Sequence, residues 1–419
     1  MTAGTAEIAR RIRDGEWTAE SVARACLERI ASRESDIGAW AHVNPDAVLE
    51  RARALDRALP RGVLHGVPIG VKDVIDTSDQ PTGHGSPIYA GHRPARDAAC
   101  VVRLRDAGAL ILGKTVTAEF AFAHPGGTRH PLATAHTPGG SSSGSAAAVA
   151  DGMVPAALGT QTGGSTIRPS AFCGIVGYKP AFGSIPTEGL KPLAPSLDTI
   201  GVLARRLEDI PLLTGVLTAR PVRPVRDGPP RLALCRTPYW DRAGAPARSV
   251  LLETMEAARE AGAKTREIEL PAKFARLDDA HRVVMSAEVA RSMDVEWRAD
   301  AARLSEAMRA FIERGRRETA EDVRTGWALA SDCRRRLRAL CEDGEVLVTL
   351  SAPGEAPRGL ASTGDAVFCR LWTLLAPPCL HLPVSRGPSG LPLGVQLVAP
   401  EGDEGALFGA AEWMAEHLS

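Results

Sequence analysis

The chain has 419 residues, which is long enough for one large domain or for two or three of ordinary size. Hydrophobic residues make up 44% and charged residues 24% of it, an ordinary composition for a soluble globular protein. Fifty basic residues balance fifty acidic ones, so the net charge predicts neither a nucleic-acid partner nor an anionic membrane surface.

The first half of the chain predicts helices followed by a buried sheet. Residues 1–60 are expected to be helical, with Thr18 as an N-cap and a second helical run over 46–59. Over about 62–205, short apolar runs alternate with Gly, Pro and Thr, which is typical of buried strands and small-residue helices. We expect this segment to be the core of an α/β fold, a mixed central sheet sandwiched by helices.

The second half predicts a helical cap and a return to strands. A Pro- and Arg-rich connector at 219–230 precedes a strand in RLALCRTP and a helix in SVLLETMEAAREAGA. The arginine-rich run over about 278–341 is helical in pattern and is expected to cap the site. Strand patterns return in EVLVTLSAP, HLPVSRG and LPLGVQLVAP, before a helix from Glu404. We expect one large domain, a helical segment 1–60 leading into 61–419.

The sequence contains no pattern of a signal peptide, a membrane span or a metal site. The first residues have no apolar core, and apolar stretches such as 146–150 are far shorter than a span. Eight cysteines occur singly, without CxxC or zinc-ligand spacing. These features predict a cytoplasmic protein with reduced cysteines and without a metal or other cofactor.

Lysine is rare in this chain and gathers in one segment. Only six of the fifty basic residues are lysine, and four of them are Lys72, Lys114, Lys179 and Lys191. The same segment holds the clusters of glycine and serine. Because a buried lysine can lose its proton near neutral pH and arginine cannot, this clustering suggests a lysine base.

Two familiar motifs in this segment are not expected to form a nucleotide-binding site or a catalytic nucleophile. Residues 108–115, GALILGKT, match the P-loop pattern, but the four residues between the glycines are expected to form a core strand instead of a phosphate-binding turn. Residues 140–144, GSSSG, match the nucleophile elbow with Ser142 at the centre, but no strand precedes them.

Three other motifs carry more information because they occur together. GVPIGVKD (66–73) places Lys72 at the end of an apolar strand, and GGSSSGSAAA (139–148) is a glycine turn entering a helix of small residues. GTQTGGSTIRP (159–169) is a second glycine-rich turn, ending in serine and arginine. Taken singly, each suits a tight turn that packs a helix on a sheet, with Lys72 paired to Asp73 or another acid.

In this order the motifs closely resemble the amidase signature family. Lys72 and Ser141 are 141 − 72 = 69 positions apart, and Ser141 and Ser165 are 165 − 141 = 24 apart. Both separations are similar to those of the family's Lys, cis-Ser and nucleophilic Ser. The resemblance extends from about residue 66 to residue 398. Arg168 lies three residues after Ser165, as in the malonamidase branch, whereas many members carry this arginine two residues after.

The resemblance implies a catalytic triad. Ser165 would attack the substrate carbonyl, while Ser141, joined to Gly140 by a cis peptide bond, would relay its proton to a neutral Lys72. The backbone N–H groups of four consecutive residues would form the oxyanion hole: Thr162, Gly163, Gly164 and Ser165.

The resemblance also implies which residues contact the substrate, namely Gly140, Thr160 and Arg168. Two roles for Arg168 stay open. Its guanidinium is expected either to bind a substrate carboxylate bidentately or to pair with Asp198.

The resulting expectation is an amidohydrolase that cleaves a small-molecule amide through an acyl-serine. A carbamate or ester hydrolase would use the same triad, since the sequence does not specify the leaving group. An amidotransferase A-type subunit is a further alternative, which the neutral chain and the position of Arg168 disfavour. We expect a small-molecule substrate and no nucleic-acid or membrane partner, and leave a homodimer open.

Overall fold

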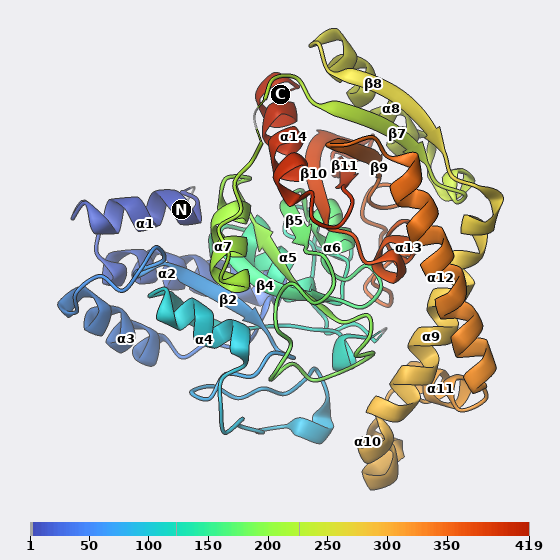
Figure 1. The fold of residues 1–419 in the computed structure, drawn as a ribbon. Helices are drawn as coiled ribbons and strands as arrows, with labels where there is room; N and C mark the ends of the chain where they lie inside the picture. The colour runs from blue at the N-terminus through green and yellow to red at the C-terminus, as the bar shows by residue number, and fades with distance from the viewer. Residues whose placement is uncertain (1–2, 123, 226, 419) are drawn as a thin grey trace.

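The centre of the molecule is a mixed β-sheet, shown in Figure 1. A computed structural model describes residues 3–122, 124–225 and 227–418. Within these ranges, eleven strands form one sheet in the order β1-β3-β2-β4-β6-β5-β10-β11-β9-β7-β8. The strands are β1 (Trp40–His42), β2 (Pro68–Lys72), β3 (Leu110–Thr115), β4 (Ala156–Gln161), β5 (Val176–Lys179), β6 (Thr199–Ala204), β7 (Arg231–Arg236), β8 (Lys264–Glu269), β9 (Glu345–Leu350), β10 (Cys379–Arg386) and β11 (Pro392–Val398). β2 runs parallel to β3 and β4, and β7 to β8 and β9, whereas the other neighbours are antiparallel.

Fourteen α-helices lie around this sheet in the described part of the chain. They are α1 (Thr5–Arg13), α2 (Ala19–Ile37), α3 (Pro45–Arg57), α4 (Ala99–Asp106), α5 (Ser143–Ala150), α6 (Ile167–Cys173), α7 (Asp209–Thr218), α8 (Ala245–Glu260), α9 (Leu277–Ser292), α10 (Asp294–Asp300), α11 (Glu306–Gly315), α12 (Ala320–Leu340), α13 (Val367–Leu375) and α14 (Glu404–His417). The expected α/β architecture with a mixed sheet is confirmed.

The alternation of side chains along β6 shows that both faces of the sheet are covered. Leu203 belongs to a core cluster with Val149 of α5, whereas its neighbour Val202 belongs to the main core with Leu213 of α7. Successive side chains of a strand point to opposite faces. Helices α5 and α7 therefore pack on opposite sides of β6.

The neighbouring strand β5 extends the same two layers. Tyr178, opposite Val202 in the register, contacts Phe408 of α14, with ring centroids 5.0 Å apart. Gly177, opposite Leu203, faces α6 so closely that a Cβ there would lie 2.2 Å from Ser170 Oγ. Helices α5 and α6 thus cover one face, and α7 and α14 the other (Figure 1).

Helices α9–α12, here called the cap, lie beside the sheet at the lower right of Figure 1. α9 packs against α11 and α12 within the cap, and against α13 outside it. Glu296 on α10 is 1% exposed, accepts a 2.6 Å hydrogen bond from Tyr89 Oη and pairs with Lys191, which attaches the cap to the core. The helical pattern expected over 278–341 is confirmed.

The other expected elements agree with the structure in most places. Thr18 caps α2, and its hydroxyl accepts a 3.0 Å hydrogen bond from Ser21 N. The sequence does not predict β1, β8 or α13. β1 has only three residues, β8 is a largely exposed edge strand, and α13 is buried on nearly all sides, so none has a clear periodicity. Because β1 pairs with β3, the segment 1–60 contributes to the same sheet, and a boundary at residue 60 stays a prediction.

The P-loop-like segment is a buried strand, as expected. Every residue of β3 is buried, including Lys114. Its Nζ donates to Ile75 O and Thr82 Oγ1, each at 2.6 Å, and lies 3.7 Å from Asp73 Oδ1. The donors of this lysine are therefore directed at protein acceptors and not at a phosphate site.

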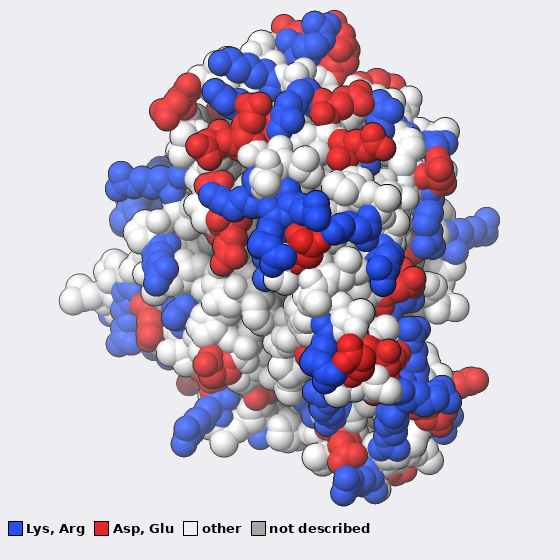
Figure 2. Space-filling view, turned by 45° about the vertical axis from the view of Figure 1, so that its right-hand side comes forward, with Lys and Arg blue, Asp and Glu red and all other residues white. Residues whose placement is uncertain are grey.

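Charges are mixed on the face of the molecule in Figure 2. Lys and Arg side chains alternate there with Asp and Glu instead of gathering into a region of one sign. No helix in the described ranges is long and apolar enough to cross a membrane.

The buried pair of Lys114 and Asp73 predicts a large loss of stability on substitution. Lys114→Met should lower the free energy of unfolding by about 3–5 kcal/mol, because it leaves Asp73 buried without its cation. Urea denaturation followed by circular dichroism measures this. The matched control is Arg53→Met, which breaks an exposed pair with Glu20 and should leave the midpoint nearly unchanged. A stable Lys114→Met variant would contradict the structural role.

Candidate active site

Lys72 ends β2 at the centre of the candidate site. The side chain is fully buried, as is every residue of β2, since both faces of the sheet are covered. Its Nζ lies 2.7 Å from Ser141 Oγ and 2.7 Å from Thr160 Oγ1. Among the described residues it forms no ion pair, so the expected alternative of a pair with Asp73 is wrong; Asp73 is next to Lys114 instead.

This environment favours the neutral form of Lys72. Burial lowers its pKa well below the ordinary value, while the negative charge of Asp198 raises it and the positive charge of Arg168 lowers it further. Burial is the largest of these effects because an ammonium group loses its hydration without gaining a contacting anion. A buried amine bonded only to hydroxyls is suited to accept a proton.

Ser141 reaches Lys72 from a glycine turn before α5. The Gly140–Ser141 peptide bond is cis, as the resemblance implies, and Ser141 is 1% exposed. Gly139 has φ +83°, and a Cβ there would lie 2.8 Å from Pro169 Cα. A residue without a side chain is thus required where this turn meets α6.

Ser142, the centre of the nucleophile-elbow pattern, is fully buried. Its Oγ donates to Thr160 O and accepts from Thr160 N, both at 3.2 Å. This hydroxyl holds the turn against β4, as expected of a structural residue.

Ser165 lies in the second glycine turn, between β4 and α6. The Gln161 side chain holds this turn, because its Oε1 accepts hydrogen bonds from the N–H groups of Thr166 and Ile167 at 3.0 Å. Gln161 thereby caps the first turn of α6. Ser165 is 8% exposed and lines a cavity, and its Oγ bonds to no other described residue. No hydrogen bond links Ser165 to Ser141 in the described chain.

The carbonyl groups of the Thr162–Gly164 turn all accept hydrogen bonds from elsewhere. His281 Nε2 on α9 donates to Thr162 O, and Thr373 Oγ1 on α13 donates to Gly163 O, each at 2.7 Å. Gly164 O accepts from Arg168 N at 2.9 Å.

The backbone donors of this turn remain available for a ligand. The N–H groups of Gly163, Gly164 and Ser165 donate to no described residue, and all three residues line the cavity. Gly164 has no room for a side chain, since a Cβ would lie 2.9 Å from those of Ala366 and Cys369. The turn presents donors without competing carbonyl oxygens, the arrangement an oxyanion requires.

His281 must hold its proton on Nε2, since a carbonyl oxygen can only accept. Burial lowers the pKa of this imidazole to about 4, so the ring is neutral near pH 7. Neither His281 nor Thr373 is predicted from the sequence. They lie more than a hundred residues beyond the turn, and neither stands in a motif.

Arg168 does not pair with Asp198, so that alternative is wrong. Asp198 accepts instead from Thr162 Oγ1 at 2.5 Å and from two backbone N–H groups, those of residues 193 and 194. Burial raises its pKa to about 6, so it is charged above that pH.

The guanidinium of Arg168 is turned toward the backbone. Its Nη2 donates to Gly140 O at 2.6 Å and to Thr363 Oγ1 at 3.0 Å, and its Nη1 donates to Gly364 O at 2.9 Å. The arginine lines the cavity with both terminal nitrogens already engaged. A bidentate contact with a substrate carboxylate stays a prediction.

The cavity at Ser165 has a volume of 270 Å³. At roughly 30 Å³ for each water-sized group, it holds about nine such groups, enough for a small substrate. Its walls come from the two sides of the molecule, the core and the cap: Ala121, Phe122, Thr162, Gly163, Gly164, Ser165, Arg168, His281, Arg282, Met285, Phe311, Thr363, Gly364, Ala366 and Arg370. Neither Gly140 nor Thr160, both expected to contact substrate, is in this lining. A larger cavity of 620 Å³, around residues 178–188, contains none of the expected triad.

Comparisons with known proteins show a family match over most of the chain. The amidase family model matches residues 21–408. The chain is 34% identical over 462 aligned residues to the A-type subunit of the glutamyl-tRNA(Gln) amidotransferase of Nitratidesulfovibrio vulgaris, covering 96% of this chain and 94% of that relative. The corresponding protein of Chloroflexus aggregans is 45% identical, but over only 50% of this chain and 45% of its own length.

Solved structures of amidases share the fold. A crystal structure described as an amidase superposes with a TM-score of 0.92, 29% identity and full coverage of both chains. The peptide amidase of Stenotrophomonas maltophilia superposes with a TM-score of 0.83 and 26% identity, covering 99% of this chain and 97% of that one. From the span of the family match and the full-length relatives, the chain belongs to the amidase family.

Proposed function

We propose that this protein hydrolyses the amide bond of a small molecule through an acyl-serine intermediate. The observation that carries the proposal is the fully buried amine of Lys72, which contacts two hydroxyls and no carboxylate of the described chain. Membership of the amidase family supports cleavage of a carbon–nitrogen bond. The small cavity beside Ser165 supports a small substrate.

In the proposed mechanism, Ser165 Oγ attacks the carbonyl carbon and passes its proton to Ser141 Oγ. Ser141 gives its own proton to the neutral amine of Lys72. The carbonyl oxygen becomes an oxyanion, which the backbone donors at Thr162, Gly163, Gly164 and Ser165 stabilise. The proton then returns through Ser141 to the leaving nitrogen as the carbon–nitrogen bond breaks. Water repeats the sequence on the acyl-serine and releases the acid.

The contact from Ser165 to Ser141 has to close when substrate binds. Catalytic hydrogen bonds are often long without substrate and tighten in the complex. Ser165 has no competing partner among the described residues, so no described hydrogen bond has to break for this contact to form.

A second candidate is supported by the full-length likeness to a component of an amidotransferase. The same acyl-serine step would then pass ammonia to a partner protein instead of releasing it to water. A panel of amides, carbamates and esters, assayed with the purified chain alone, tests the choice. Steady hydrolysis of an amide without a partner supports the amidase, whereas activity that needs added partner proteins supports the amidotransferase. A preference for carbamates or esters would identify a different leaving group for the same triad.

The nucleophile can be tested by removing one hydroxyl. Ser165→Ala should abolish turnover with little change in stability, because the side chain has no described hydrogen-bond partner to lose. Mass spectrometry of the wild type with a slow ester substrate should locate the acyl group on Ser165. Ser142→Ala is the control for the elbow pattern, and an adduct on Ser142 would refute the assignment.

The base can be tested through the pH profile. Since a protonated Lys72 cannot accept a proton, kcat/KM should rise with pH to a plateau, with its midpoint below the ordinary lysine pKa. Lys72→Arg should be nearly inactive, because arginine keeps its proton at these pH values. An active Lys72→Arg variant would disprove the role of the base.

The variant Asp198→Asn provides a second test of Lys72 as the base. The amide keeps the shape of the carboxylate and can still bond to Thr162 and the backbone, but it removes the negative charge that raises the pKa of Lys72. The midpoint of the profile should therefore move to lower pH. A midpoint that stays in place would mean that another group controls the profile.

Arg168 is expected to position the Gly140–Ser141 peptide. Arg168→Met should lower the free energy of unfolding by about 1.5–3 kcal/mol, because two buried acceptors and one partly buried acceptor lose a charged donor. It should also move the pH midpoint upward, since the charge of Arg168 lowers the pKa of Lys72. Denaturation and pH profiles measure both effects, and losses confined to acidic substrates would instead support a carboxylate anchor.

A further inference from the structure

All the ionised side chains that line the cavity are cationic. Arg168, Arg282 and Arg370 lie in its wall, and no acidic residue or lysine of the described chain does. His281 adds no charge near neutral pH, since its pKa is lowered to about 4 by burial. A wall of this kind attracts an anionic group.

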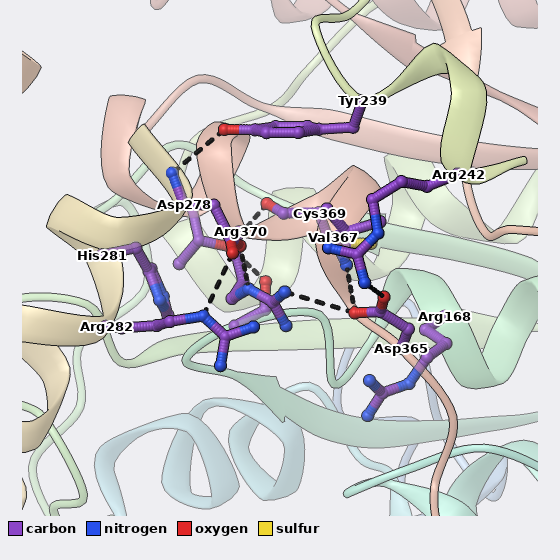
Figure 3. Close-up of polar contacts among 12 residues, drawn as sticks. Arg168, Tyr239, Arg242, Asp278, His281, Arg282, Asp365, Val367, Cys369 and Arg370 are labelled. Atoms are coloured by element: carbon purple, nitrogen blue, oxygen red, sulfur yellow. Dashed lines mark hydrogen bonds and ion pairs between the residues drawn. The ribbon is translucent and has the colours of Figure 1, made fainter. Parts of the chain in front are cut away.

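Two aspartates hold these arginines in place without neutralising all of them. Arg282 Nε donates to Asp278 Oδ2 at 3.0 Å, and Arg370 Nε donates to the other oxygen of Asp278. Arg370 also bonds to Asp365, which in turn accepts from Arg242. Figure 3 shows this network. Together with Arg168, the cluster contains four arginines and only two carboxylates, so its net charge is positive.

Several donors of the cluster have no described acceptor. Arg282 uses only its Nε, so both of its terminal nitrogens are unengaged, and its side chain is 39% exposed. Arg370 likewise has Nη1 unengaged, with its side chain 12% exposed. Arg168 Nε is buried and has no hydrogen-bond partner among the described residues. In Figure 3 the guanidinium groups of Arg282 and Arg370 lie next to each other, and that of Arg168 lies apart from them, below Asp365.

The anion would bind close to the reacting bond. A Cβ added to Gly163, in the turn that presents the oxyanion donors, would lie 3.6 Å from Arg370 Cγ. Another part of the wall is apolar, where the ring centroids of Phe122 and Phe311 lie 4.5 Å apart. The cavity therefore suits a small molecule with an anionic end and a short apolar part.

We propose that the substrate of this site is a small amide that bears a carboxylate, and that Arg282 of the cap, together with Arg370, binds this carboxylate and determines specificity. The inference rests on the proposed amide hydrolysis. It moves the anion site from Arg168, whose terminal nitrogens hold the backbone, to Arg282, whose two terminal nitrogens are unengaged, and to Arg370, whose Nη1 is unengaged. A planar guanidinium with two available donors matches a carboxylate bidentately.

The experiment compares two substrates that differ only at one end, where succinamic acid has a carboxylate and butanamide has a methyl group. In the wild type, kcat/KM for the acid should exceed that for the neutral amide by about tenfold to a hundredfold, as expected of a charge-assisted contact. Arg282→Gln should lower this ratio by about tenfold, and Arg282→Lys should restore part of it, because lysine keeps the charge but not the bidentate geometry.

Arg314→Gln is a matched control. Arg314 forms the same kind of pair through Nε, with Glu318 four residues away at 3.2 Å, and its side chain is 43% exposed, close to the 39% of Arg282. It does not line the cavity, so its substitution should leave the ratio unchanged. A wild-type ratio near or below one, or a ratio that Arg282→Gln leaves unchanged, would overturn the inference.

A binding measurement separates this inference from the proposed reaction. Succinate should raise the melting temperature of the wild type and of Arg314→Gln, but not that of Arg282→Gln. If no amide is hydrolysed and succinate still binds through Arg282, the proposed reaction fails and the anion site stands. If butanamide is hydrolysed and succinate does not bind, the reaction stands and the anion site fails.

Discussion

The burial of one amine without a contacting anion is the constraint on which the site depends. An ammonium group at the position of Lys72 would lose its hydration and gain only two hydroxyl acceptors. The neutral amine avoids that cost, so the fold itself selects the proton acceptor. Every residue of β2 is buried, so water is excluded from this amine. The glycine turn before α5 and the end of β4 then bring in Ser141 and Thr160, the two hydroxyls that the amine contacts.

The sequence points to this inner part of the site because its motifs are short and local, and because their order and spacing resemble those of a known family. Glycines are needed where the turn at Gly139 has a positive φ and where Gly164 has no room for a Cβ. Serines in such turns and a lysine at the end of an apolar strand are visible in short motifs. The strands and helices around them are predicted for the same reason, since their periodicity lies within about ten residues. Elements without such periodicity, such as β8 and α13, are not.

The outer part of the site depends on tertiary packing and is not predicted. Thr373 and His281 bond to carbonyls of the Thr162–Gly164 turn from helices that are distant in sequence. No motif marks them, because any donor of the right length on a helix in that place would suffice. The role of Arg168 illustrates the same limit. Its spacing from Ser165 predicts that Arg168 lies at the site, and it does line the cavity. Its partners Thr363 and Gly364, however, come from a loop almost two hundred residues away.

Helix α9 carries two neighbouring residues with different roles, neither of which is predicted from the sequence. His281 bonds to the turn that we propose as the oxyanion hole, and the next residue, Arg282, carries the unengaged donors of the cavity wall. Asp278, one helical turn earlier, holds Arg282 and also Arg370, which packs near Gly163. A shift of α9 would therefore change the charge of the wall and the support of the oxyanion turn together. An anionic group that binds Arg282 also stabilises α9 in the position from which His281 holds Thr162. In the proposed function, the same contact therefore favours both the binding of the substrate and the ordering of the Thr162–Gly164 turn.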